Sequence, residues 1–307
     1  MQRAKALARV IAPLVAVVVL SAGCASAPAG AKAGVPAAAP GSGSGVQANG
    51  VQAGPVPTGT APAATGRVIR PAALPPGTLY LDPATGRREV IEADISRTAV
   101  LIGDSQSEGA AGVSAKNTWP CTALAKLGFQ VQFRGRGGTG YVAANGKIGN
   151  YPDALERGNW HLPYGPAPLV VIEGGGNDAS HGATDAQILA NAARLLRDLK
   201  QTYPTSRFVM IGALAKGAAH GGGRRTQVDT LLGSFAAANA IPFISAGNWL
   251  TKYALTNKMA DGVHLTAAGH QVLSGVLLQE LLRLGVAAPA RAGGAVVAKT
   301  DKTDKPS

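Results

Sequence analysis

Short apolar runs alternate with longer stretches of helical periodicity between residues 98 and 284. The runs are continuously apolar, which is typical of strands that are buried on both faces. Between residues 185 and 201 the apolar side chains recur at helical spacing, and Thr184 stands where a helix N-cap is expected. The expected strands are 98–102, 129–133, 169–172, 208–212 and 241–245, and the expected helices are 119–127, 185–201, 226–240 and 266–284.

Repeated strand–helix units of this kind predict an α/β fold, in which a parallel sheet of about five strands carries helices on both faces. Ligands of such sheets bind beyond the carboxyl ends of the strands. Ser105 and Asn177 each follow an expected strand, and His264 precedes the last expected helix. We therefore expect these three side chains to meet at one edge of the sheet.

Composition divides the chain into a folded part and flanking segments. Residues from about 25 to 76 are almost all Ala, Gly, Pro, Val, Thr and Ser, and the C-terminal segment is similar, with Lys and Asp added. Such segments lack the large apolar side chains that offset the entropy of folding. The predicted organisation is a signal at 1–27, a disordered Ala/Gly/Pro-rich tether at 28–76, a folded domain at 77–286 and a disordered tail at 287–307.

The first residues have the character of an export signal. Arg3, Lys5 and Arg9 precede an apolar run at 10–20, which is too short to span a bilayer. The run leads into Cys24 through small residues and resembles a bacterial lipoprotein signal, although Ser21 replaces its usual leucine. We expect an exported protein of the cell envelope that is anchored to the membrane by a lipid on Cys24. Cleavage after residues 25–27 and an uncleaved membrane helix are the alternatives.

Charge and cysteine content narrow the possible partners. The net charge is +12, but residues 98–286 hold 16 Lys and Arg against 11 Asp and Glu, a difference of only +5. No basic run is interleaved with aromatic residues, so nucleic-acid binding is not expected, and attraction to an anionic envelope surface is the simpler use of the charge.

If Cys24 is lipidated or removed, only Cys121 remains, so an internal disulfide is excluded. We expect the thiol of Cys121 to be buried.

Three short strings carry the candidate chemistry: 103–105 (Gly-Asp-Ser), 174–178 (Gly-Gly-Gly-Asn-Asp) and 261–264 (Asp-Gly-Val-His). They supply a hydroxyl, a side-chain amide among glycines, and an imidazole with a carboxylate three residues upstream. The serine and the asparagine each have a simpler interpretation, as residues of a turn. Together they are the parts of acyl transfer through serine, namely a nucleophile, an oxyanion donor, a base and an orienting acid.

The four remaining histidines are expected to be surface, loop or helix residues: His161, His181, His220 and His270. Asp178 is expected to be a structural acceptor that holds its loop. Neither metal-ligand spacing nor a dinucleotide-binding glycine motif is present, so we expect no metal and no cofactor.

These motifs, in this order, resemble the SGNH hydrolases, also called the GDSL esterase/lipase family, over about residues 98–285. The resemblance implies a flavodoxin-like three-layer α/β/α sandwich. It assigns Ser105 as nucleophile, His264 as general base and Asp261 as its orienting partner. It also implies an oxyanion hole made of the Ser105 N–H, the Asn177 amide and a glycine N–H. Gly138 is the first choice for that glycine and Gly137 the second.

The predicted function is therefore hydrolysis of carboxylic esters through serine. The expected substrates are short-acyl esters, such as acetyl groups on cell-wall glycans. An acyltransferase of the same family and a non-catalytic wall-binding protein are the alternatives.

Overall fold

The computed structural model describes residues 71–290. The predicted signal with Cys24, the tether before residue 71 and the tail after residue 290 lie outside these residues and stay predictions. No helix among residues 71–290 combines the length and the apolar character that crossing a membrane requires.

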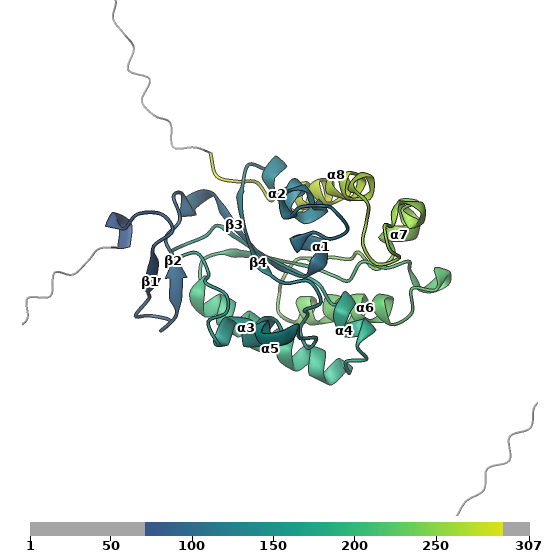
Figure 1. Ribbon diagram of the computed structural model, residues 1–307, viewed down its shortest axis with the longest axis horizontal. Helices are drawn as coiled ribbons and strands as arrows, with labels where there is room; N and C mark the ends of the chain where they lie inside the picture. Colours follow the sequence, from purple (N-terminus) through teal and green to yellow (C-terminus); the bar gives the residue numbers. More distant parts are fainter. Residues whose placement is uncertain (1–70, 291–307) are drawn as a thin grey trace, which may run out of the picture. The chain divides into compact units, whose positions relative to one another are not determined.

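A five-stranded parallel sheet with the order β4-β3-β5-β6-β7 forms the centre of the fold (Figure 1). Every residue of β3 and β5 is buried, as their continuous apolar character predicts. In the register, Leu101 of β3 lies opposite Phe133 on one side and Val171 on the other. The strands are β3 (Thr98–Gly103), β4 (Gln130–Gly135), β5 (Leu169–Glu173), β6 (Arg207–Ile211) and β7 (Phe243–Ile244).

Helices cover both faces of this sheet and complete three layers (Figure 1). One layer holds α1 (Ser105–Glu108), α2 (Trp119–Lys126), α7 (Trp249–Lys252) and α8 (Ala267–Arg283). The other holds α3 (Tyr151–Glu156), α4 (Gly176–Ser180), α5 (Asp185–Thr202) and α6 (Gly223–Ala238). Short 3-10 turns lie at Pro71–Ala73, Ile95–Arg97, Ala115–Asn117, Gly146–Ile148, Ala218–His220 and Thr256–Lys258. The predicted α/β architecture is confirmed.

Two hydrophobic cores lie on opposite sides of the sheet because successive strand residues point in opposite directions. Val100 and Ile102 of β3 belong to the core that α5 and α6 close. Ala99 and Leu101 belong to the core that α2 and α8 close. Strand β3 therefore cannot shift by one residue without exchanging its two faces, which fixes the place where it ends.

The last strand is shorter than the sequence indicated. The expected strand at 241–245 is reduced to Phe243–Ile244 at the edge of the sheet. Ile241 donates its N–H to Ala236 O at the end of α6, and Pro242 has no N–H to donate. Pairing therefore begins only after the proline, as is usual for edge strands.

A small antiparallel hairpin precedes the sheet and was not predicted. It pairs β1 (Leu79–Leu81) with β2 (Arg88–Val90). Its strands are too short for a recognisable alternation, although the turn at 82–86 contains Asp, Pro and Gly, which favour turns. Val90 N–H donates to Leu162 O at 2.8 Å, so the hairpin is tied to the loop that leads into β5.

Thr184 caps α5 as predicted, in a reciprocal capping box with Gln187. The Gln187 N–H donates to Thr184 Oγ1 at 3.3 Å, and the Thr184 N–H donates to Gln187 Oε1 at 3.0 Å.

Thr184→Ala removes the capping acceptor, so we expect it to lower the free energy of unfolding by about 1 kcal/mol. Urea denaturation measures this change. The exposed Thr205, changed to Ala, is the matched control and should differ from the parent by less than about 0.5 kcal/mol; equal losses in both variants would contradict a capping role.

Candidate active site

Ser105 lies directly beyond the carboxyl end of β3 and begins the short helix α1. Asp104 is the N-cap of this helix, and its Oδ1 accepts a hydrogen bond from the Gln106 N–H at 2.9 Å. The turn is thus closed by the side chain that precedes the serine. Since β3 is fixed between two cores, the position of the Ser105 hydroxyl is fixed with it.

Ser105 Oγ lies 2.9 Å from His264 Nε2, and His264 Nδ1 lies 2.7 Å from Asp261 Oδ2. The imidazole therefore bridges a hydroxyl and a carboxylate that come from opposite ends of the folded domain. The sequence predicted this meeting at one sheet edge, and the structure brings the three side chains together. A hydroxyl, a ring nitrogen and an acid in this order can transfer a proton away from Ser105.

The loop around Asp261 holds the imidazole in place. Its Oδ1 accepts the N–H of Val263 at 3.0 Å and the N–H of His264 at 2.7 Å. The hydrogen bond from the His264 side chain is the main cause that lowers the pKa of Asp261 to about 2, and the two backbone N–H groups add to it. An ionised Asp261 keeps the ring proton on Nδ1, which leaves Nε2 free to accept from Ser105.

Two backbone N–H groups beside the nucleophile are without an intramolecular acceptor among residues 71–290: those of Ser105 and Gly138. The Gly137 N–H, in contrast, donates to Glu108 Oε2 at 2.6 Å. A Cβ added to Gly137 would lie 3.4 Å from Ser105 Cβ, so this loop passes close to the serine. Of the two predicted glycines, Gly138 is therefore the one with a donor available for an oxyanion.

Asn177 also lies at this edge, but its amide is already engaged. Nδ2 donates to Thr139 O at 2.9 Å and to Asp104 Oδ2 at 3.1 Å. These two bonds use both of its hydrogens. Asn177 can reach an oxyanion only by exchanging one of them, a requirement that the sequence did not reveal.

Asp178 is a structural acceptor, as expected. Its carboxylate is fully buried and accepts three consecutive backbone N–H groups, from Tyr141 at 2.9 Å, Val142 at 2.7 Å and Ala143 at 2.8 Å. This interaction ties the loop that contains Gly138 to α4, the helix that carries Asn177. Two of the candidate oxyanion donors are thereby held by one carboxylate.

A second buried acid, Glu173, lies beneath the nucleophile and was not identified from the sequence. It ends β5, is 1% exposed and accepts a hydrogen bond from Ser107 Oγ at 2.8 Å. Burial is the main cause that raises the pKa of Glu173 well above its usual range and that of Asp104 to about 6. The charge of Asp104 adds to the rise at Glu173, and the charge of Asp178 adds to the rise at Asp104. The only signal in the sequence was a carboxylate at the end of a fully apolar run.

Two further contacts position the site. Gln106 Nε2 donates to Val263 O at 3.0 Å, so the helix of the nucleophile is linked directly to the loop of His264. Glu108, beside its bond to Gly137, pairs with Arg136 at 3.2 Å. Both residues follow Ser105 within one turn of helix, and both act on segments distant in sequence.

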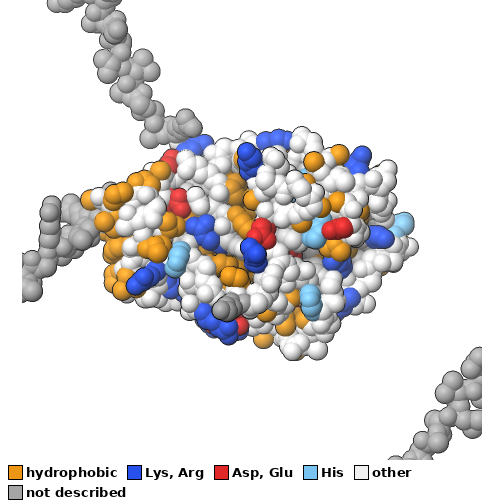
Figure 2. Space-filling view, in the orientation of Figure 1, with side chains coloured by type: hydrophobic (Ala, Val, Ile, Leu, Met, Phe, Trp, Pro, Cys, Tyr) orange, Lys and Arg blue, Asp and Glu red, His pale blue; other side chains and the backbone are white. Residues whose placement is uncertain are grey.

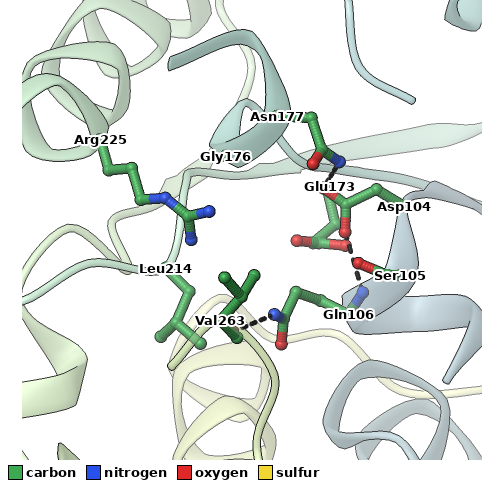
Figure 3. A pocket seen from close by; sticks show the side chains of 9 residues that line it. All are labelled: Asp104, Ser105, Gln106, Glu173, Gly176, Asn177, Leu214, Arg225 and Val263. Atoms are coloured by element: carbon green, nitrogen blue, oxygen red, sulfur yellow. Dashed lines mark hydrogen bonds between the residues drawn. The ribbon is translucent and has the colours of Figure 1, made fainter. Parts of the chain in front are cut away.

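These residues surround a small pocket in which the side chains of Ser105, Asn177 and Arg225 converge (Figure 3). Its free volume is about 10 Å³, which is the space of about one water molecule. The lining residues are Asp104, Ser105, Gln106, Glu173, Gly176, Asn177, Leu214, Arg225 and Val263. The described residues contain no group of three His, Cys, Asp or Glu side chains that could hold a metal ion.

The other titratable candidates have structural surroundings. His270 is buried in α8, and its Nδ1 accepts the Trp119 N–H at 3.0 Å; burial lowers its pKa to about 4. Cys121 is buried, as expected, and burial raises the pKa of its thiol. Both groups are therefore uncharged near neutral pH.

Asp261→Asn tests the tautomer of His264. The amide would present an N–H to Nδ1, so the ring proton would move to Nε2, which then cannot accept from Ser105. We expect kcat for ester hydrolysis to fall on the order of 10²-fold or more, with little change in folded stability. Steady-state kinetics and thermal denaturation measure the two effects. Activity equal to that of the parent would show that Asp261 does not orient the base.

Asp104→Asn tests the raised pKa of Asp104 through the pH dependence of the free energy of unfolding. A carboxyl group whose pKa rises from 3.8 to about 6 on folding stabilises the fold fully below about pH 4, and this contribution is lost as the pH rises through 6. We expect the parent to lose on the order of 3 kcal/mol more unfolding free energy than the variant between about pH 4 and 7. Urea denaturation at both pH values measures this. Equal losses would contradict the raised pKa.

Comparison with known proteins places the chain in a family. A model of the GDSL-like Lipase/Acylhydrolase family matches residues 101–272, which is more than half of the chain and includes Ser105, Gly138, Asn177, Asp261 and His264. No curated protein sequence matches the chain.

Solved structures resemble the chain at low identity. An active-site mutant of a family two carbohydrate esterase from Clostridium thermocellum has a TM-score of 0.50 and 16% identity, covering 62% of this chain and 64% of that one. This chain therefore spans less than two thirds of that esterase. Est24, a carbohydrate acetylesterase from Sinorhizobium meliloti, has a TM-score of 0.45 and 19% identity, covering 61% and 99%. From the matched family model, the chain belongs to the GDSL-like lipase/acylhydrolase family, the SGNH hydrolases that its motifs resemble.

Proposed function

We propose that the protein hydrolyses carboxylic esters through a covalent acyl-enzyme on Ser105. The single observation that carries this proposal is the continuous chain from Ser105 through His264 to Asp261, with links of 2.9 and 2.7 Å. Such a chain activates a hydroxyl that is otherwise a weak nucleophile. Membership of a hydrolase family agrees with it.

In the first half of the reaction, Ser105 Oγ attacks the ester carbonyl carbon while His264 Nε2 takes the hydroxyl proton. The C–O bond to the alcohol then breaks, and the same proton passes from Nε2 to the leaving alkoxide. In the second half, His264 Nε2 takes a proton from water as the water oxygen attacks the acyl carbon. The bond between that carbon and Ser105 Oγ then breaks, and the proton passes from Nε2 to Oγ as the acid leaves. Asp261 remains ionised throughout and stabilises the imidazolium.

The N–H groups of Ser105 and Gly138 are the donors proposed for the oxyanion, because neither is used inside the described fold. Asn177 is proposed as the third donor, after its amide exchanges one of its bonds to Thr139 and Asp104. Each such donor typically contributes on the order of 10²–10³ in rate.

The proposed substrates are short-acyl esters, with acetyl groups on cell-wall glycans as the first candidates. Leu214 and Val263 are the only large apolar side chains that line the pocket beside Ser105, so it offers little apolar surface to a fatty acyl chain. The fold shared with a carbohydrate esterase from Clostridium thermocellum is compatible with a glycan as the alcohol.

An exported location, with a lipid on Cys24 as anchor, would bring the domain to such glycans. Labelling of the chain by a radioactive fatty acid, with Cys24→Ser as control, tests the anchor; label that persists in the control would contradict it.

Ser105→Ala tests the proposed mechanism. Removal of the nucleophile should lower kcat for 4-nitrophenyl acetate on the order of 10⁴-fold or more, because the remaining groups act only through the serine. Ser234→Ala, an exposed serine on α6, is the matched control and should keep the parent activity.

The same assay with 4-nitrophenyl esters of increasing acyl length should show the highest kcat/KM at the short end. Undiminished turnover by Ser105→Ala would end the proposal. Product analysis in the presence of a glycan acceptor would reveal acyl transfer in place of hydrolysis.

A further inference from the structure

Arg225 lines the pocket of the nucleophile and forms no ion pair with any residue that the structure describes. It belongs to the first turn of α6, and its guanidinium projects into the space between Gly176 and Leu214 (Figure 3). Its hydrogen bond is to a neutral group, from Nη2 to Ser180 Oγ at 3.2 Å. No carboxylate among residues 71–290 comes within 4.0 Å of it. Most of its N–H donors are therefore available to a ligand.

The neighbouring Arg224 shows what a structural arginine does on the same helix turn. It pairs with Asp185 at 2.6 Å and donates to Ala183 O at 2.8 Å, so it joins α6 to the start of α5. Arg224 does not line the pocket. Arg224 therefore holds two helices together, whereas Arg225 lines the pocket that contains Ser105.

The two acids that line the pocket with Arg225 already accept hydrogen bonds from other groups. Asp104 accepts from the Gln106 N–H and from Asn177, and Glu173 accepts from Ser107. Arg225 acts on Asp104 only through space, where it lowers the pKa that burial raises more strongly. Leu214 and Val263 add apolar walls, which strengthen the electrostatic interaction with any anion that enters.

We propose that Arg225 binds a carboxylate carried by the ester substrate close to the scissile carbonyl. This inference rests on the proposed function and specifies its substrate class as anionic esters. A guanidinium recognises a carboxylate through paired N–H donors, which an ammonium cannot reproduce. The carboxylate can belong to a dicarboxylic acyl group, such as succinyl, or to an acetylated acidic sugar.

The experiment compares two pairs of esters that differ in charge. Monoethyl succinate against ethyl butyrate places the carboxylate on the acyl side. A methyl glucuronide against a methyl glucoside, each carrying one acetyl ester, places it on the alcohol side. Acid release is followed in a pH-stat, and the specificity ratio is kcat/KM of the charged ester divided by that of its neutral partner.

In the parent protein, we expect a specificity ratio above about 10 in one of the two pairs, and that pair identifies the side that carries the carboxylate. Arg225→Gln should lower this ratio on the order of 10–100-fold, the usual range for a lost hydrogen bond to a charged group. Arg225→Lys keeps the positive charge but loses the paired N–H donors of the guanidinium. Its specificity ratio should therefore lie between those of the parent and of Arg225→Gln. Arg224→Gln, the matched control, should keep the parent ratio.

Two results would overturn the proposal while leaving the proposed function intact. One is a parent ratio near unity in both pairs with the neutral esters hydrolysed. The other is an equal loss for charged and neutral esters in Arg225→Gln, which would make Arg225 a counter-charge for Asp104 or a tie to Ser180. If the parent hydrolyses none of the four esters, the proposed function itself fails, and the inference fails with it.

Discussion

The burial of β3 and β5 on both faces is the constraint on which the site depends. Their parallel pairing brings both carboxyl ends to one edge, where Ser105 and α4 follow directly. Each strand is locked in register because its alternate residues fill two different cores. The reactive groups can therefore stand on short, tightly turned segments, because the strands beneath them cannot slide.

The same burial places several acids beneath the nucleophile, and each is accommodated differently. Asp178 is compensated by three backbone N–H groups and serves to hold two loops together. Asp104 and Glu173 receive fewer donors, so burial raises the pKa of each. Asp261 is half exposed and strongly hydrogen-bonded, which lowers its pKa to about 2. The carboxylate nearest the imidazole is thus the one that stays ionised most readily.

Most of the fold could be predicted from the sequence because its strands and long helices have continuous, unambiguous patterns, as in β3 and α5. Ser105, Asn177 and His264 could be placed at one edge because topology alone puts them there. The hairpin of β1 and β2 was missed because its strands are too short to show a period.

Contacts that join remote segments could not be predicted. Glu108 meets Gly137 at a separation of 29 residues, and Gln106 meets Val263 at a separation of 157. Neither residue type indicates its partner, and only the packing of α1 against the neighbouring loops reveals it. The choice between Gly137 and Gly138 depended on such a contact.

The hydrogen bonds around Ser105 also determine what kind of ligand the site favours. The acids Asp104, Asp178 and Glu173 already accept bonds from the protein, whereas the N–H groups of Ser105 and Gly138 and the guanidinium of Arg225 still have donors to give. A substrate gains most from such a pocket when it brings acceptors. One is the carbonyl oxygen that becomes negative as Ser105 attacks. The other is the proposed substrate carboxylate, which would pair with the guanidinium of Arg225. Because that guanidinium is already oriented, the entropic cost of binding the carboxylate is lower.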